Sequence, residues 1–218
     1  PDYLTNPEAQ VIPHLKTAER IVNDVTGLNP IVVSRVEAPA TQEELIRLVR
    51  ESTEPLCIGG GRFSMGGQTA SPGCLHIDMR KLNRIVSFSP SEAVICVEAG
   101  IRWCDIQQHI DPHGLSVKIM QTYANFTVGG SLSVNCHGRY IGLGPLILSV
   151  RSLDVLTASG DMMHVSPHEQ AEIFYACVGG YNAVAIIVQA EFELTANNPV
   201  IRSHRKMPRS AYGAFFRP

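Results

Sequence analysis

The sequence lacks the features that mark several protein classes. No apolar run approaches the roughly 18 to 20 residues of a membrane-spanning helix, and Pro1 opens the chain without the basic-then-apolar pattern of an export signal. Neither charge sign dominates, since 18 Lys and Arg stand against 20 Asp and Glu, so nucleic acid is not an expected partner. With 218 residues and 44% hydrophobic side chains, we expect one cytoplasmic, globular unit with no membrane span.

Metal-binding and disulfide patterns are also missing. The six cysteines include no C-x-x-C pair, which favours reduced thiols over disulfides or a zinc site. Asp105, His109 and His113 have the i, i+4, i+8 spacing of a metal-binding helix face, but Pro112 interrupts the helix just before His113. We therefore favour a structural role for these three residues and expect no metal.

Two common nucleotide-binding motifs are absent from a chain that is nevertheless rich in glycine loops. The segment GGGRFSMGGQ at 59–68 is not followed by G-K-[ST], and it is not a G-x-G-x-x-G run that opens a helix with an acid about 20 residues on. A Walker A loop and a conventional Rossmann dinucleotide site are therefore not expected.

The hydrophobic periodicity alternates between helix and strand, which predicts an α+β (α/β) fold. In the first half, Thr41 and Glu44 form a capping box ahead of an amphipathic run. The expected elements there are a helix over 14–27, a strand over 30–39, a helix over 41–52 and a strand over 55–61. This order predicts a small parallel unit, whose ligand sites lie at the carboxyl ends of its strands.

The rest of the chain continues the pattern and ends in a basic tail. We expect strands over 75–79, 84–89, 93–100, 149–158, 161–166 and 184–195, and helices over 101–110 and 168–180. Two lobes are predicted, at about residues 1–120 and 121–200, with a cleft between them. All five cations after Glu193 lie in the tail, so 201–218 is either a solvated segment or the beginning of a further domain.

Three segments place glycines or small residues at the end of a strand or helix: 59–68, 127–138 and 179–187. At such positions backbone N–H groups can approach an anion closely. One such segment alone indicates a tight turn, whereas three in one small chain indicate a shared ligand.

Five segments in order, over about 30–195, resemble the FAD-binding (PCMH-type) domain of the vanillyl-alcohol oxidase, or p-cresol methylhydroxylase, superfamily. They are PLCIGGGRFSMGG, EAGIRWCDIQQHIDPHGLSV, TVGGSLSVNCHG, SLDVLTASGDMMHVS and GGYNAVAIIVQAEFEL. The NCHG run looks most like the sugar and polyol oxidase branch. The resemblance implies a small parallel α/β lobe plus a larger mixed or antiparallel sheet lobe with flanking helices over 1–200, with 201–218 as the start of a cap domain.

The resemblance also implies which residues contact FAD. They are Gly59, Gly60, Gly61, Arg62, Phe63 and Ser64 around the pyrophosphate, then Thr127, Gly129, Gly130, Ser131, Ser133, His137 and Gly138, and finally Ile186 and Ile187 near the adenine. Many family members carry a flavin-linking histidine where this chain has Phe63, so non-covalent FAD is expected. Asn182 and Ala185 stand where glycine is usual. His137 is a candidate catalytic base, although a loop-fixing role is favoured.

The implied activity is that of an FAD-dependent oxidoreductase that accepts a hydride from an alcohol carbon of a sugar, polyol, aldonolactone or hydroxy acid. Two other hypotheses stay open. One is a flavin-binding module that is inactive without its cap domain or a partner chain, and the other is an α/β domain without flavin.

Overall fold

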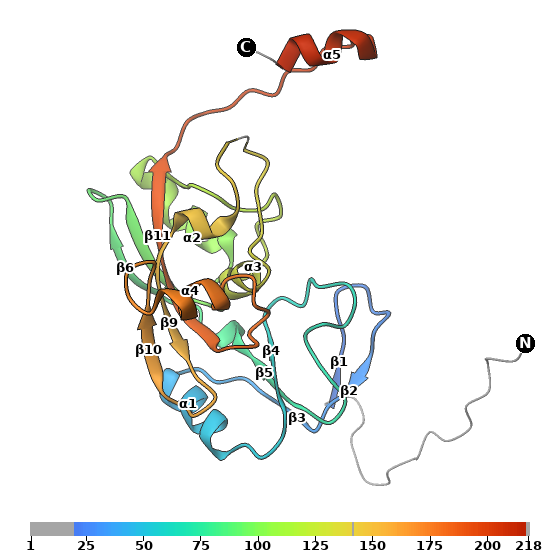
Figure 1. Ribbon diagram of the computed structural model, residues 1–218, viewed down its shortest axis with the longest axis vertical. Coiled ribbons are helices and arrows are strands. Elements are labelled where there is room, and N and C mark those ends of the chain that lie inside the picture. The colour runs from blue at the N-terminus through green and yellow to red at the C-terminus, as the bar shows by residue number, and fades with distance from the viewer. Residues whose placement is uncertain (1–19, 141, 217–218) are drawn as a thin grey trace, which may run out of the picture.

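Two β-sheets organise the protein, which a computed structural model describes over residues 20–140 and 142–216 (Figure 1). The larger sheet is antiparallel, in the order β10-β9-β11-β7-β6, and β8 pairs with the far end of β11. Its strands are β6 (Ile85–Ser89), β7 (Val94–Glu98), β8 (Leu115–Val117), β9 (Val150–Leu156), β10 (Met162–Val165) and β11 (Ile186–Ala196). The strand β11 is its spine, because β7, β8 and β9 all pair with it.

Three helices enclose the core of this larger sheet. They are α2 (Trp103–Ile110), α3 (Val128–Ser133) and α4 (Ala171–Cys177). Trp103 and Phe192 meet edge to face in this core, with ring centroids 5.4 Å apart. Short 3₁₀ turns connect the elements: η2 (Met79–Lys81), η3 (Asp111–His113) and η4 (Leu146–Ser149). The turn η3 holds Pro112 and ends at Gly114 with φ +67°, which confirms the predicted stop of α2.

The smaller sheet is parallel, in the order β3-β5-β4, with α1 as its crossover helix. Its elements are β3 (Arg35–Glu37), α1 (Gln42–Glu51), β4 (Leu56–Gly59) and β5 (Leu75–Asp78). The predicted capping of α1 is confirmed. The Thr41 hydroxyl accepts from the Glu44 N–H at 3.2 Å, and the Glu44 carboxylate accepts from the Ala40 N–H at 2.8 Å.

The helix α1 connects the two sheets through one apolar cluster. Leu45 and Val49 of α1 pack with Ile77 of the parallel sheet and with Leu156 and Ile186 of the antiparallel sheet. The sheets divide between β5 and β6, since β6, β7 and β8 already belong to the antiparallel sheet. The change from one sheet to the other therefore falls between residues 78 and 85, and the lobe boundary near residue 120 stays a prediction.

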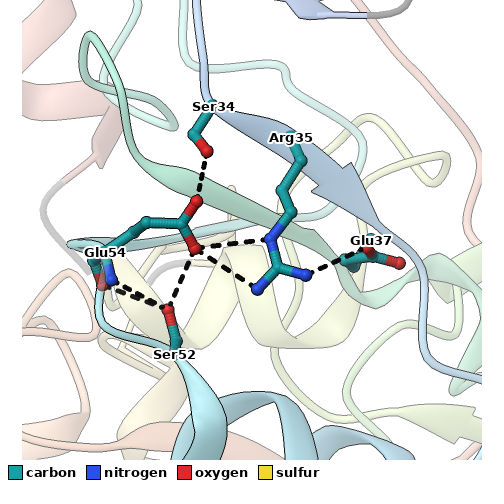
Figure 2. A network of polar contacts seen from close by, with 5 residues as sticks. All are labelled: Ser34, Arg35, Glu37, Ser52 and Glu54. Atoms are coloured by element: carbon teal, nitrogen blue, oxygen red, sulfur yellow. Dashed lines mark hydrogen bonds and ion pairs between the residues drawn. The ribbon is translucent and has the colours of Figure 1, made fainter.

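A polar network lies near the amino ends of the parallel strands β3 and β4 (Figure 2). Glu54, in the α1–β4 connection, accepts from the Ser34 hydroxyl and from Arg35 Nε and Nη2, the latter two at 3.3 Å. Arg35 also reaches Glu37 at 3.5 Å, and the Ser52 hydroxyl accepts from the Glu54 N–H at 3.2 Å. The hydrogen bond from Ser34 is the main reason that the pKa of Glu54 lies below its usual value.

The helix expected over 14–27 is wrong at residues 20–27, and its first part, residues 14–19, lies outside the described residues. Residues 20–27 do not continue a helix: β1 (Ile21–Val22) pairs antiparallel with β2 (Ile31–Val32), and Asp24 closes the turn by accepting from the Thr26 N–H at 2.8 Å. The expected strand over 30–39 is split into β2 and β3 because its halves pair with different strands. Asp and Asn favour such turns over helix interiors, and apolar spacing did not reveal that preference.

The last helix, α5 (Arg209–Phe216), lies beyond the end of β11 and away from both sheets (Figure 1). None of its residues is buried. Across the described ranges, no helix combines the length and the apolar character needed to cross a membrane.

Candidate functional site

All three glycine-rich segments meet at one open cleft of roughly 990 Å³, its mouth included. Of the residues expected to contact FAD, the cleft is lined by Gly59, Gly60, Gly61, Arg62, Phe63, Ser64, Thr127, Gly129, Gly130, Ser131, Ser133 and Ile187. The predicted convergence of the glycine-rich segments on one cleft is therefore confirmed.

The first loop, residues 59–64, leaves the carboxyl end of β4. Within the described ranges, the backbone N–H groups of residues 60–64 have no protein acceptor, so they form a row of free donors. The β1–β2 turn holds this loop from outside: the Val25 N–H donates to the Arg62 carbonyl at 3.0 Å, and the Gly67 N–H donates to Asp24 at 3.2 Å. Arg62 has φ +57°, which bends the loop into a concave turn.

An ion-pair cluster places positive charge beside the first loop. Asp78 accepts from Arg62 Nη2 at 3.0 Å and from Arg80 Nε at 2.8 Å. Burial opposes ionisation of Asp78, but the Arg80 hydrogen bonds and the two positive charges outweigh it and hold the pKa of Asp78 below its usual value. Two cations against one carboxylate leave a net positive site. In addition, Arg62 Nε is buried without a hydrogen-bond partner among the described residues.

The second loop, the glycine-rich segment 127–138 that contains α3, differs from the first. The backbone N–H groups at the start of α3 already donate to protein acceptors. The Val128 N–H donates to Ile101 O at 2.9 Å, the Gly129 N–H to Ala99 O at 2.7 Å, and the Gly130 N–H to the Thr127 hydroxyl at 3.4 Å. These helix N-terminal amides therefore already have protein acceptors, unlike those of the first loop. Glycine at 129 serves close packing, since a Cβ there would lie 2.9 Å from Ala99 Cβ.

The hydroxyls of the two α3 serines also have protein hydrogen-bond partners. The Ser131 hydroxyl accepts from Trp103 Nε1 at 2.8 Å and donates to Thr127 O at 3.0 Å. The Ser133 hydroxyl donates to Gly129 O at 2.7 Å and accepts from Asn182 Nδ2 at 3.0 Å. Both residues line the cleft, but their hydroxyls make hydrogen bonds within the protein that stabilise its wall.

The third segment contributes its turn and one strand residue. Tyr181 and Asn182 line the cleft with φ values of +53° and +59°, a conformation that asparagine tolerates well. Ala185 is not among the residues with positive φ, so it carries no such strain. Ile187 faces the cleft, whereas Ile186 packs in the α1 cluster, because successive strand residues point to opposite faces.

Two residues from the NCHG run do not reach the cleft. His137 is exposed, pairs with Pro145 in an isolated bridge, and contacts the Gly138 carbonyl through Nδ1 at 3.1 Å. Neither His137 nor Gly138 lines the cleft, whereas Cys136 does. Burial raises the pKa of the Cys136 thiol, which donates to Gln121 Oε1 at 2.8 Å.

Phe63 belongs to an aromatic cluster at the edge of the cleft. Its ring centroid lies 4.8 Å from that of Phe126 and 5.2 Å from that of Tyr123. These tilted and edge-to-face contacts fix the ring in the wall.

Several residues that line the cleft were not predicted to contact FAD, some within the glycine-rich segments and some outside them. They are Ile58, Gln68, Thr69, Met79, Ala99, Phe126, Val134, Cys136, Tyr181 and Asn182. Met79 and Ala99 follow strands β5 and β7, so a search at the ends of predicted strands would have found them. Asp105 pairs with Arg102 at 2.7 Å, and the described residues hold no group of three metal-ligating side chains.

Comparison with known proteins identifies relatives of this arrangement. Residues 30–166 match the family model for an FAD binding domain. The chain is 32% identical to decaprenylphosphoryl-beta-D-ribose oxidase of Mycolicibacterium smegmatis over 78% of its length, and 34% identical to cytokinin dehydrogenase 6 of Oryza sativa over 82%. It is 29% identical to L-gulonolactone oxidase of Bos taurus over 69%.

The matches cover only part of those relatives. The chain spans 38% of the ribose oxidase and 36% of each of the other two.

Proposed function

Because this chain belongs to the FAD binding domain family and its cofactor is FAD, we propose that the cleft holds FAD with its pyrophosphate at the first loop. The row of free N–H groups at residues 60–64 is the observation that carries this proposal. Backbone donors at the carboxyl end of a parallel strand are a common anion site. The N–H groups at the start of the second loop already have protein acceptors, so this loop contributes to the wall of the cleft and not to the row of free donors.

Arg62 adds a charged donor at the same place. Its Nε is buried and has no partner among the described residues, although its Nη2 is held by Asp78. A phosphate oxygen at the first loop would satisfy this atom with a charge-assisted hydrogen bond. The net positive charge of the Arg62, Asp78 and Arg80 cluster favours a dianionic pyrophosphate over a neutral ligand.

The remainder of the cleft suits aromatic rings. Ile58, Met79 and Ile187 line it with apolar side chains, as do the more exposed Val134 and Tyr181. Such surfaces bury a flat ring system by the hydrophobic effect.

We propose that FAD is held non-covalently. Phe63 has no nucleophilic atom, and its ring is packed against Phe126. Acid or heat denaturation should therefore release the yellow colour into the supernatant. Flavin that stays with the precipitate would contradict the proposal and direct attention to Cys136 or His137.

We further propose that the complete protein oxidises an alcohol carbon of a sugar, polyol, aldonolactone or hydroxy acid. When bound, FAD supplies the acceptor for the hydride. Relatives named as a ribose oxidase and a gulonolactone oxidase support this class. The relative named as a cytokinin dehydrogenase supports cytokinins as a second substrate class. We assign no residue of this chain a catalytic role.

The alternative is a cofactor module that is inactive until a cap domain, of which 201–218 would be the beginning, or a partner chain completes it. Anaerobic addition of polyols, aldonolactones, hydroxy acids and a cytokinin to the FAD-loaded chain separates the two hypotheses. Bleaching by one class supports the oxidase and identifies its substrate. A yellow protein that none of them bleaches supports the module.

A further inference from the structure

His76 occupies an unusual position directly beneath the first loop. It lies in the middle of β5, the central strand of the parallel sheet, and is completely buried. Its neighbours Leu75 and Ile77 pack with α1, so His76 points to the opposite face of the sheet. A Cβ built on Gly59 would lie 2.5 Å from the His76 Cε1 and 2.6 Å from its Nε2. The ring therefore supports the residue where the loop begins, and only glycine fits above it.

Packing alone does not explain a histidine at this point. Among the described residues neither Nδ1 nor Nε2 makes a hydrogen bond of good geometry, although the backbone of Thr69 lies close enough to favour the protonated ring. A buried polar atom without a partner destabilises the fold, and an apolar ring would avoid that penalty. The opposite residues of the flanking strands, Val36 on β3 and Cys57 on β4, bring no charge to the ring.

The charged groups near His76 belong to the cluster beside the first loop. They are Arg62 from the loop, Asp78 from β5 itself and Arg80 from η2. Burial is the main cause that lowers the pKa of His76 below its ordinary value, and the charge of Arg62 adds to it while Asp78 opposes it. The ring is neutral at neutral pH. Its protonation would place a buried cation beside Arg62.

We propose that His76 is a positioning residue for the cofactor site: the neutral ring holds Gly59 and the free amides of the first loop in place, and protonation of the ring releases the loop and the FAD. This inference rests on the proposed binding mode. An imidazolium can regain hydration only if the loop that covers it moves. The loop that moves is the one that presents the donors.

The direction of the pH effect follows from linkage. The folded state binds its proton at lower pH than the unfolded chain, so the contribution of His76 to stability is intact above its ordinary pKa and falls as the solution is acidified. If FAD binds only to the neutral form, the Kd rises below the midpoint of the ring, by up to about tenfold per pH unit for one excluded proton.

The first experiment measures the Kd of FAD from pH 8 to pH 5 for the wild type, His76→Phe and His168→Phe, with circular dichroism to confirm folding at each pH. His168 is an exposed histidine on the turn before α4 and serves as the matched control. We expect the Kd of FAD to rise at acid pH in the wild type and in His168→Phe. In His76→Phe it should vary less than threefold between pH 8 and pH 5. A wild-type slope that persists in His76→Phe overturns the proposal.

The second experiment needs neither a variant nor FAD. Nuclear magnetic resonance of the apo-protein follows the His76 ring and the amides of residues 59–64 during a pH titration. We expect the ring and the loop amides to share one midpoint below the ordinary histidine value, and the Kd to rise on its acid side. The proposal fails if the loop amides do not shift with the ring, if the ring does not titrate before acid unfolding, or if the Kd is unchanged across the midpoint. Absence of FAD binding at every pH refutes the proposed function, and the loop amides then decide the role of His76 alone.

Discussion

The two glycine-rich loops that line the cleft, residues 59–64 and the start of α3, look alike in the sequence and differ in the structure. In the first loop, the N–H groups of residues 60–64 have no acceptor in the described protein. In the second, the N–H groups of Val128, Gly129 and Gly130 all have one. Gly60 contacts the second loop so closely that a Cβ on it would lie 2.2 Å from the Thr127 hydroxyl.

The difference shows that glycine has two roles at this site. In the first loop it leaves donors uncovered for a ligand, and in the second it lets α3 pack against Ala99. Side chains of the two loops should therefore separate the two properties, with Arg62 acting on cofactor binding and Ser131 on stability.

Gly60→Leu should have the largest effect. The side chain would collide with Thr127 and push the first loop off the second, so we expect at least a 100-fold loss of FAD affinity together with a lower Tm. Gly130→Leu is the matched variant, because a Cβ there meets only the Thr127 hydroxyl, at 3.0 Å. It should remain folded and bind FAD more weakly than the wild type. Flavin absorbance and circular dichroism measure both, and near-wild-type affinity in Gly60→Leu would contradict the account.

Arg62→Leu tests the charged donor of the first loop. Loss of a charge-assisted hydrogen bond of about 1.5 to 3 kcal/mol should raise the Kd of FAD roughly 10- to 150-fold. Arg80→Gln is the control, since Arg80 pairs with the same Asp78 but does not line this cleft. Equal losses of affinity in both variants would assign the effect to net charge instead.

Ser131→Ala, unlike Arg62→Leu, should lower stability and leave FAD affinity nearly unchanged. It removes the acceptor of the buried Trp103 Nε1, and the unfolding free energy should fall by about 1 to 3 kcal/mol. The Kd of FAD, measured below the Tm of the variant, should change less than threefold. A large loss of affinity with unchanged stability would make Ser131 a cofactor ligand.

The smallest effect is expected far from both loops, in the Glu54 network (Figure 2). The pKa of Glu54 is lowered in the folded state, so its contribution to stability is present above its unfolded pKa and is lost as the pH falls through the folded value. Glu54→Gln should reduce the slope of Tm against pH below about pH 5, with the Kd of FAD unchanged at neutral pH. An unchanged slope would show that the Ser34 contact contributes nothing.

The sequence predicted the elements whose signals are local. The Thr41 and Glu44 capping box located α1, and Pro112 located the end of α2. The pairing of β7 with β11 joins residues about 100 positions apart in the chain, which local patterns do not report.

The site was predicted in outline. Glycines located the walls of the cleft, because each wall needs a close backbone approach. Which amides stay free was not predictable, since the partners of α3 are carbonyls of Ala99 and Ile101 on another segment. His76 gave no signal either, because an alternating strand does not reveal what lies over each face.

Amide hydrogen exchange with and without FAD tests the central claim most directly, since it reports on both loops in one sample. The account predicts that the amides of residues 60–64 exchange rapidly in the apo-protein and slow at least tenfold when FAD is added. The amides of Val128 and Gly129, which already have acceptors, should be protected in both states and change little. Protection that appears at Val128 and Gly129 on addition of FAD, with no change at 60–64, would contradict it.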